Sequence, residues 1–185
     1  SSIAHAGYIL MALVPFGNPD IAPGAVSSAL FYLLAYAVTS LGAWAVVIAV
    51  EKANGAEGSD GLKIADYAGL GKKHPALAAA MVVFMLSFTG VPPTLGFMGK
   101  FYLFRSVIEG GFLGLALIGV LTSLISAYFY LRIIVMMYMK DGEPEVRREP
   151  WLQATAYLAA LAVVILSLVS TPLLSWAENA FLWVF

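Results

Sequence analysis

The chain has 185 residues, of which 61% are hydrophobic and only 11% are charged, with a formal net charge of −1. Soluble domains carry about 25% charged residues, so this composition is that of an integral membrane protein. Cysteine is absent, which excludes a disulfide framework, a thiolate zinc site and a cysteine-bound iron–sulfur cluster within this sequence. The nearly neutral charge argues against a nucleic-acid partner.

Long apolar segments follow one another, and several exceed the roughly 20 residues that cross a bilayer. Continuous apolar runs exclude the alternating strands of a barrel, and helices satisfy their own backbone groups in lipid. We expect an all-α integral membrane protein, a single transmembrane domain over residues 1–185 with about five spans. The predicted spans are 1–16, 24–50, 75–109, 112–139 and 151–185.

The first apolar segment, about 14 residues from Ile3 to Phe16, is too short to cross a bilayer alone. We therefore interpret the sequence as the C-terminal part of a longer protein, with the first span truncated. Residues 24–50 are free of charge and predict a complete span. The stretch from Glu51 to His74 is rich in glycine and charge, which indicates an extramembrane loop.

The third apolar region, residues 75–109, would be about 50 Å long as one helix. A run with Gly90, Pro92, Pro93 and Gly96 interrupts it, because prolines remove amide donors and glycines tolerate the resulting backbone geometry. Two interpretations follow. The region is either one discontinuous span with a break at Gly90–Gly96, or a hairpin of two short helices that returns to the same side.

Basic residues distinguish the two interpretations, since lysine and arginine in short loops concentrate on the cytoplasmic side. A single crossing places all the loop cations on one side, whereas a hairpin moves the last three across. These cations are Lys52, Lys63, Lys72, Lys73, Lys140, Arg147 and Arg148. The sequence favours the discontinuous span, with both basic loops in the cytoplasm and the C-terminus on the outer side.

The last two spans are joined by the charged loop of residues 140–150. Both are long enough to cross a membrane. Pro172 predicts a kink in the final span.

Lys100 lies nine residues before Glu109, which places it about 14 Å from the outer end of a helix and close to the midplane. An ammonium there costs at least about 2.5–3.5 kcal/mol, so this lysine requires a partner or a hydrated cavity, and desolvation favours its neutral form. The adjacent broken segment frees carbonyls and amides, as in transporter sites at the midplane. We interpret Lys100 as a proton-handling residue; the alternative is a lysine that extends to an interface.

Other polar residues in the spans carry weaker signals. Arg105 and Glu109, four apart, predict a structural ion pair. His5 can relay protons near neutral pH, but it can equally be structural. Arg132 either anchors its span or contributes to a proton path, and Glu178 is expected to face water or a headgroup. The remaining tyrosines and tryptophans are expected to pack or to lie at the interfaces.

Four motifs stand out along the chain. They are Ser1-Ser2-Ile3-Ala4-His5-Ala6-Gly7-Tyr8, Phe31-Tyr32-Leu33-Leu34-Ala35-Tyr36, Asp66-Tyr67-Ala68-Gly69-Leu70 and Gly90-Val91-Pro92-Pro93-Thr94-Leu95-Gly96-Phe97-Met98-Gly99-Lys100-Phe101. Together they resemble subunit N of proton-pumping NADH:quinone oxidoreductase, respiratory complex I. The resemblance extends to about Met139 and is most specific in the proline–glycine–lysine segment.

The resemblance implies an antiporter-like subunit with two inverted repeats, of which this sequence would supply part of helix ten and helices eleven to fourteen. In that family the lysine of broken helix twelve belongs to a central hydrophilic axis and serves the outward half of the proton route. Lys100 stands at that position. The related antiporter-like subunits have glutamate or lysine there, so the lysine favours subunit N over at least one of them. His5 matches another position of the axis.

The resemblance also implies a translocase subunit without redox chemistry of its own. It would bind no cofactor or metal, while NADH, FMN, iron–sulfur clusters and quinone would be bound by other subunits. Its partners would be the lipid bilayer and the other membrane and peripheral subunits, especially neighbouring antiporter-like ones, in the inner (plasma) membrane of a bacterium. A stand-alone cation/proton antiporter subunit and a purely structural membrane subunit are the alternatives.

Overall fold

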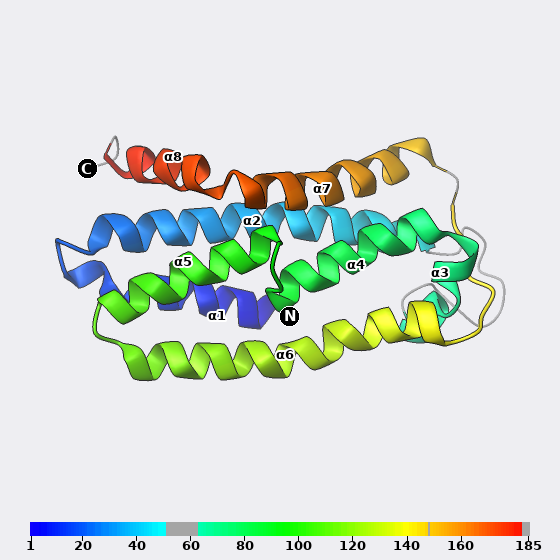
Figure 1. Ribbon diagram of the computed structural model, residues 1–185, viewed down its shortest axis with the longest axis horizontal. Helices are drawn as coiled ribbons and strands as arrows, with labels where there is room; N and C mark the ends of the chain where they lie inside the picture. Colours follow the sequence, from blue (N-terminus) through cyan, green and yellow to red (C-terminus); the bar gives the residue numbers. More distant parts are fainter. Residues whose placement is uncertain (51–62, 148, 183–185) are drawn as a thin grey trace.

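The computed structural model describes residues 1–50, 63–147 and 149–182. Their helices lie nearly parallel to one long axis (Figure 1). Along the chain these are α1 (Ser2–Ala12), α2 (Ala22–Val50), α3 (Leu70–Lys73), α4 (Pro75–Thr89), α5 (Leu95–Glu109), α6 (Leu113–Met139), α7 (Pro150–Leu168) and α8 (Ser170–Leu182), with 3-10 turns η1 (Val14–Gly17) and η2 (Ile64–Tyr67).

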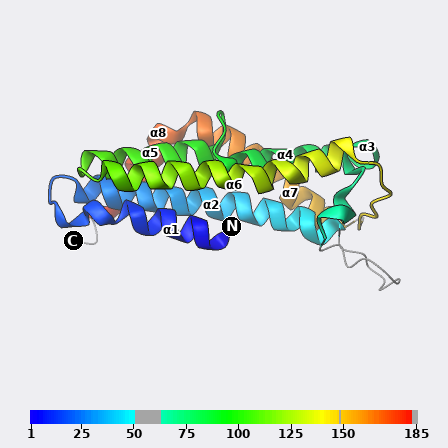
Figure 2. The same cartoon turned by 90° about the horizontal axis from the view of Figure 1, so that it is seen from below.

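Three of these helices, α2, α6 and α7, are each long and apolar enough to cross a membrane. Residues 2–17 and helix α4 form shorter apolar helices. Helix α1 has 11 residues against 29 in α2, and its first turn lies near the middle of the bundle (Figures 1 and 2). The all-α membrane fold predicted from the composition is confirmed.

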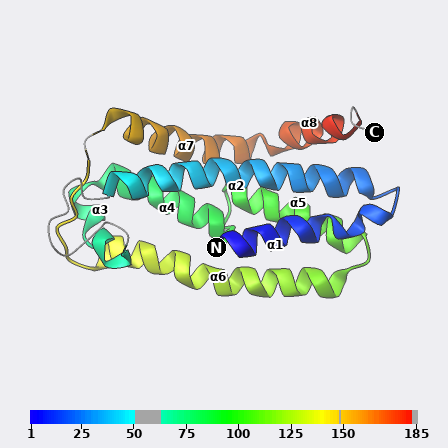
Figure 3. The ribbon, with the colours of Figure 1, turned by 180° about the vertical axis from the view of Figure 1, so that it is seen from behind.

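Helix α2 is the central element of the bundle. It contacts α1, α4, α5, α7 and α8, and it lies between the α7–α8 pair and helices α1 and α6 (Figure 3). Its buried face is rich in alanine and includes Gly42, and such small residues let neighbouring helices approach closely. At Gly42, for example, an added Cβ would lie 2.2 Å from the Phe84 ring.

Helices α4 and α5 run end to end in the same direction and together cross the bundle once (Figure 1). The discontinuous span is therefore confirmed, and the hairpin is excluded. The break covers residues 90–94, so Gly96, predicted within it, already belongs to the first turn of α5. The Thr94 hydroxyl ends the break early, because it accepts a hydrogen bond from the Phe97 amide at 3.4 Å and caps α5.

The end of α4 depends on a left-handed glycine. Gly90 has φ 86°, a conformation that glycine adopts without steric cost. The amides of Gly90 and Val91 both turn back onto the Leu86 carbonyl, at 2.9 and 3.0 Å. The last two carbonyls of α4, those of Phe88 and Thr89, are thereby left for other donors.

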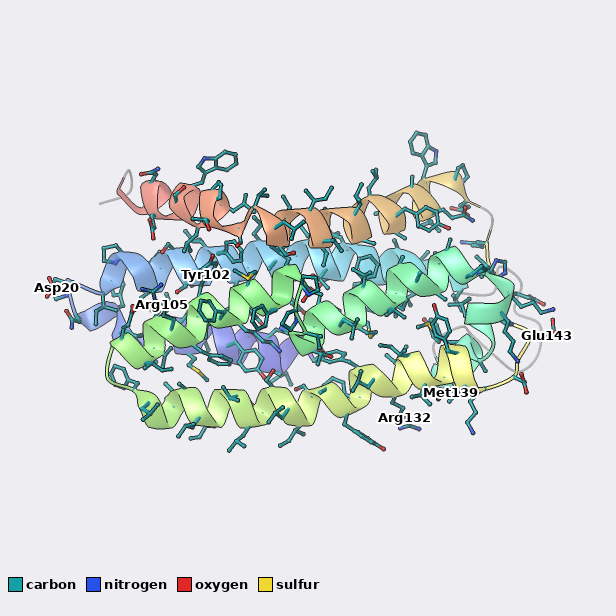
Figure 4. The ribbon with its side chains drawn as sticks, in the orientation of Figure 1. Asp20, Tyr102, Arg105, Arg132, Met139 and Glu143 are labelled. Atoms are coloured by element: carbon teal, nitrogen blue, oxygen red, sulfur yellow. The ribbon has the colours of Figure 1, made fainter. Side chains whose placement is uncertain are left out.

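The two basic loops, as far as the structure describes them, lie at the same end of the bundle. Lys72 pairs with Asp141 at 2.5 Å and Lys73 pairs with Glu143 at 2.7 Å, so the loop before α4 touches the loop after α6. The hydrogen bond from Lys72 holds the pKa of Asp141 below its usual value. Asp20 lies at the opposite end (Figure 4). Of the predicted loop cations, Lys52 and Arg148 lie outside the described residues.

The last span is interrupted at Val169, three residues before the predicted kink at Pro172. Proline has no amide hydrogen and its ring clashes with the carbonyl four residues earlier. That carbonyl belongs to Leu168, the last residue of α7, so the helix ends there and Pro172 falls in the first turn of α8.

The junction of α4 and α5 requires a residue without a side chain at Gly96. An added Cβ would lie 2.0 Å from the Ser87 carbonyl oxygen, a backbone atom that cannot move aside independently. We expect Gly96→Ala to destabilise the protein by about 3 kcal/mol or more, as for strong overpacking. Thermal unfolding of the detergent-solubilised protein measures the effect.

The matched control is Gly114→Ala on α6, where an added Cβ has no atom within 4 Å. This variant is expected to unfold at or slightly above the wild-type temperature, since alanine favours helices over glycine. Equal stability of the two variants would show that α4 and α5 do not pack as described.

Candidate functional site

The site is built around Lys100, whose side chain is 6% exposed. Its ammonium donates hydrogen bonds to the Phe88 carbonyl at 2.8 Å, the Thr89 carbonyl at 3.0 Å and the Ser123 hydroxyl at 2.6 Å. A lysine ammonium has three donors, and all three are satisfied. Helices α4, α5 and α6 therefore meet at this one nitrogen atom, beside the break in the middle of the bundle (Figure 1).

The charge of Lys100 is balanced by dipoles. The two carbonyls form the C-terminal end of α4, which carries partial negative charge and favours a cation. None of the ion pairs between described residues includes Lys100. A lysine held in this way can release its proton without leaving a buried carboxylate unpaired. Gly90 makes room for the stem, since an added Cβ would lie 3.0 Å from Lys100 Cδ.

His5 forms a second buried polar group, next to Lys100. It is 3% exposed, its Nδ1 lies 2.6 Å from Tyr32 Oη, and its Nε2 lies 3.0 Å from Tyr130 Oη. In neutral histidine one ring nitrogen donates and the other accepts, so each hydroxyl has a defined role for either tautomer. Helices α1, α2 and α6 are joined at this ring.

Two aromatic residues lie between Lys100 and His5. The Tyr8 ring centroid is 5.3 Å from the Lys100 nitrogen and 5.9 Å from the His5 ring. The Phe88 ring is 5.3 Å from His5, while the Phe88 carbonyl accepts the lysine hydrogen bond. The structure thus brings together the two residues selected from the sequence.

A pair of hydroxyls extends the polar group toward the basic-loop end. Thr39 Oγ1 lies 3.0 Å from Ser87 Oγ, and Ser87 Oγ accepts a hydrogen bond from the Gly96 amide at 3.1 Å. A cavity of about 10 Å³ lies between these hydroxyls and His5. One water molecule requires roughly 10–15 Å³, so the space is close to the size of a single water.

A larger cavity of about 680 Å³ runs from Lys100 to Arg105 and Glu109 along α5 and α6. Most of its lining is aromatic or aliphatic. Arg105 Nε donates to Glu109 Oε1 at 2.8 Å, so the predicted ion pair is present. Arg132 lies apart from the site, on the exposed face of α6, and points away from the bundle (Figure 4). Glu178 is exposed, at the end of the bundle where α5 ends.

Three residues of the site were missed by the sequence reasoning. The sequence predicts packing or interface positions for Tyr32 and Tyr130, whereas their hydroxyls contact His5. Nothing in the sequence singles out Ser123, because no local pattern distinguishes it from the other serines and threonines of the α6 segment. The signal that could have found Tyr32 is its four-residue spacing from Tyr36, which predicts a shared face of α2. Both rings stack on His5.

Comparisons with known proteins show the family to which this chain belongs. The family described as "NADH:quinone oxidoreductase/Mrp antiporter, TM" matches residues 1–126. NADH-quinone oxidoreductase subunit N of Bdellovibrio bacteriovorus is 42% identical over 184 residues, 98% of this chain and 37% of the relative. Subunit N of Trichlorobacter lovleyi is 45% identical over 186 residues, 97% of this chain and 36% of the relative.

Solved structures show the same fold. A chain of respiratory complex I from Thermus thermophilus with bound aureothin superposes with a TM-score of 0.78 at 32% identity, over 94% of this chain and 38% of that one. A chain of the Mrp complex from Dietzia sp. also superposes with a TM-score of 0.78, at 20% identity, over 95% of this chain and 40% of that one. This second likeness shows the fold alone.

The chain spans 37% and 36% of the lengths of these two curated relatives. The family match covers most of the chain and includes the broken helix that carries Lys100. The chain therefore belongs to the NADH:quinone oxidoreductase/Mrp antiporter transmembrane family, within which it resembles subunit N.

Proposed function

We propose that this chain is the proton-translocating part of an antiporter-like subunit of NADH:quinone oxidoreductase, and that Lys100 loads and releases the proton. The observation that carries the proposal is the setting of Lys100: a buried ammonium whose three partners are two carbonyls and one hydroxyl. A side chain that only extended to an interface would place its nitrogen in water.

The same three partners can also form hydrogen bonds with the neutral amine of Lys100. After proton loss, the lysine nitrogen keeps two donors for the carbonyls of Phe88 and Thr89 and gains a lone pair. The Ser123 hydroxyl, which accepts from the ammonium, can then rotate and donate to that lone pair. Both protonation states of Lys100 are therefore hydrogen-bonded, and the site does not have to rearrange its backbone between them.

We propose that His5 exchanges protons with Lys100 through water and the neighbouring hydroxyls. An imidazole can take a proton at one nitrogen and release it from the other, and hydroxyls next to both nitrogens support that transfer. Tyr32 and Tyr130 supply those hydroxyls. The small cavity beside His5 offers a place for one water next to Ser87 and Thr39, on the side of the ring that Lys100 does not line.

This role requires no redox group in the chain. Cysteine is absent from the sequence, and we propose that NADH, FMN, iron–sulfur clusters and quinone are bound by other subunits. The partners would be the other membrane and peripheral subunits, above all neighbouring antiporter-like ones. We place the protein in a bacterial inner membrane, with the basic loops in the cytoplasm and the C-terminus outside, because basic loops remain inside.

A stand-alone cation/proton antiporter subunit is the second candidate, favoured by the likeness to the Mrp complex fold. The identities of 42% and 45% to subunit N support the oxidoreductase instead. Purification of the full-length subunit from native membranes separates the two. Flavin and iron–sulfur subunits would accompany it in the first case and would be missing in the second.

Replacement of the lysine tests the proposal. In the intact parent complex, Lys100→Ala is expected to reduce proton pumping and coupled quinone reduction to a small fraction of wild type, because the site loses its titrating group. Pumping is measured in sealed vesicles, with assembly checked by native electrophoresis. Lys140→Ala, which removes an exposed loop lysine, is the matched control and should pump normally. Normal pumping by assembled Lys100→Ala complex would refute the proposal.

The two histidines allow a similar comparison. Glutamine keeps hydrogen-bonding capacity but cannot carry a proton near neutral pH. His5→Gln is therefore expected to slow pumping severalfold with assembly intact. His74→Gln changes the residue that precedes α4, in the loop, and should leave pumping unchanged. Equal pumping rates in the two variants, measured in the same vesicle assay, would remove His5 from the proton route.

A further inference from the structure

The break in the last span lies beside the break that adjoins Lys100. Helix α7 ends at Leu168 and α8 begins at Ser170, and Figure 1 shows this junction at nearly the same level of the bundle as the junction of α4 and α5. Two serines flank the α7–α8 junction, and both are buried: Ser167 is 7% exposed and Ser170 is 4% exposed. Each of them contacts a different part of the α4–α5 region.

Ser167 binds the break itself. Its hydroxyl donates to the Pro93 carbonyl at 3.1 Å and to the Val164 carbonyl, in its own helix, at 2.7 Å, which makes a three-centre bond. No other hydrogen bond between described residues reaches the Pro93 carbonyl. Pro92 and Pro93 have no amide hydrogens, so these two residues can be held only through their carbonyls and rings. Because the hydrocarbon region offers no water, the Pro93 carbonyl depends on this serine.

Ser170 binds the helix that carries Lys100. Its Oγ lies 3.2 Å from Tyr102 Oη, and Tyr102 follows Lys100 by two residues on α5. The Tyr102 ring is itself held by edge-to-face contacts with Phe31 and Phe101, at centroid distances of 5.2 and 5.8 Å. The α7–α8 junction therefore holds α5 at two points, one before its first turn and one in the turn of Lys100.

The position of α5 decides whether Lys100 reaches its partners. The Lys100 backbone belongs to α5, whereas the carbonyls that its ammonium binds at 2.8 and 3.0 Å, those of Phe88 and Thr89, belong to α4. Residues 90–94 connect the two helices. A shift of about 1 Å between α4 and α5 would stretch both bonds beyond the range of an effective hydrogen bond. Contacts that hold residues 90–94 and α5 therefore also maintain the hydrogen bonds of the ammonium.

We propose that Ser167 and Ser170 are positioning residues for the Lys100 site, and that the α7–α8 junction supports the break between α4 and α5. Ser167 holds the Pro93 carbonyl and Ser170 holds Tyr102, so α5 keeps Lys100 against the end of α4. This inference rests on the proposed function, because positioning affects pumping only if Lys100 carries the proton.

Serine variants of the parent complex test the inference through the proton-to-electron ratio in sealed vesicles, with assembly checked by native electrophoresis. Ser167→Ala should lower this ratio severalfold, because the Pro93 carbonyl loses its donor. The matched control is Ser175→Ala. The Ser175 hydroxyl also donates to a carbonyl three residues earlier in the chain, at 2.8 Å, but it is exposed and none of its described hydrogen bonds reaches the break. This control should keep the wild-type ratio.

Threonine and valine separate the hydrogen bond from packing. The two side chains have nearly the same shape, but only threonine keeps the hydroxyl. Ser167→Thr should therefore keep a ratio near wild type, while Ser167→Val should behave as Ser167→Ala does. Equal ratios in the threonine and valine variants would overturn the inference, since side-chain bulk rather than the hydroxyl would then matter.

Tyr102→Phe provides an independent test, which decides the question if a serine variant does not assemble. It removes the hydroxyl that contacts Ser170, keeps the ring and should lower the ratio, whereas Tyr128→Phe, at an exposed position of α6, should not. A wild-type ratio in assembled Ser167→Ala or Tyr102→Phe complex, beside a lowered ratio in Lys100→Ala, would overturn this inference and leave the proposed function standing. Wild-type pumping by Lys100→Ala would reject the proposed function instead.

Discussion

The hydrogen bonds between the Lys100 ammonium and the carbonyls of Phe88 and Thr89 connect the two unfavourable features of this fold. A helix that stops inside a membrane leaves carbonyls without donors, and a lysine at that depth leaves an ammonium without acceptors. Each feature satisfies the other. A variant that loses either one is left with buried unpaired groups, which explains why the break and the lysine occur together.

Much of the remaining structure holds this contact in place. Gly90 turns the backbone so that the two carbonyls face Lys100, and Gly96 lets α5 begin directly against the last turn of α4. Helix α2 then supports both half-helices and carries Tyr32 to His5. The result is a row of groups with exchangeable protons, held by rigid helices and enclosed by aromatic rings.

The sequence predicts the parts of this structure that bilayer thickness and proline geometry control. Apolar lengths reveal the spans, and the residues between Gly90 and Gly96 reveal the break. The hydrogen-bond partners of Lys100 and His5 are harder to predict from the sequence. Ser123 and Tyr130 reach the site through the packing of α6, which no local pattern encodes. Helix boundaries also differ from those predicted where a cap or a proline acts on neighbouring residues. Thr94 caps α5 and ends the break early, and Pro172 ends α7 before Val169.

The most direct test asks whether Lys100 must change its protonation state or need only supply a fixed charge. Arginine keeps the charge and cannot release its proton in a protein, and the cavity of about 680 Å³ beside Lys100 has room for its larger head. The proton-to-electron ratio of the assembled Lys100→Arg complex in sealed vesicles measures the difference. We predict a ratio well below wild type; a wild-type ratio would contradict the account and leave Lys100 as a structural cation.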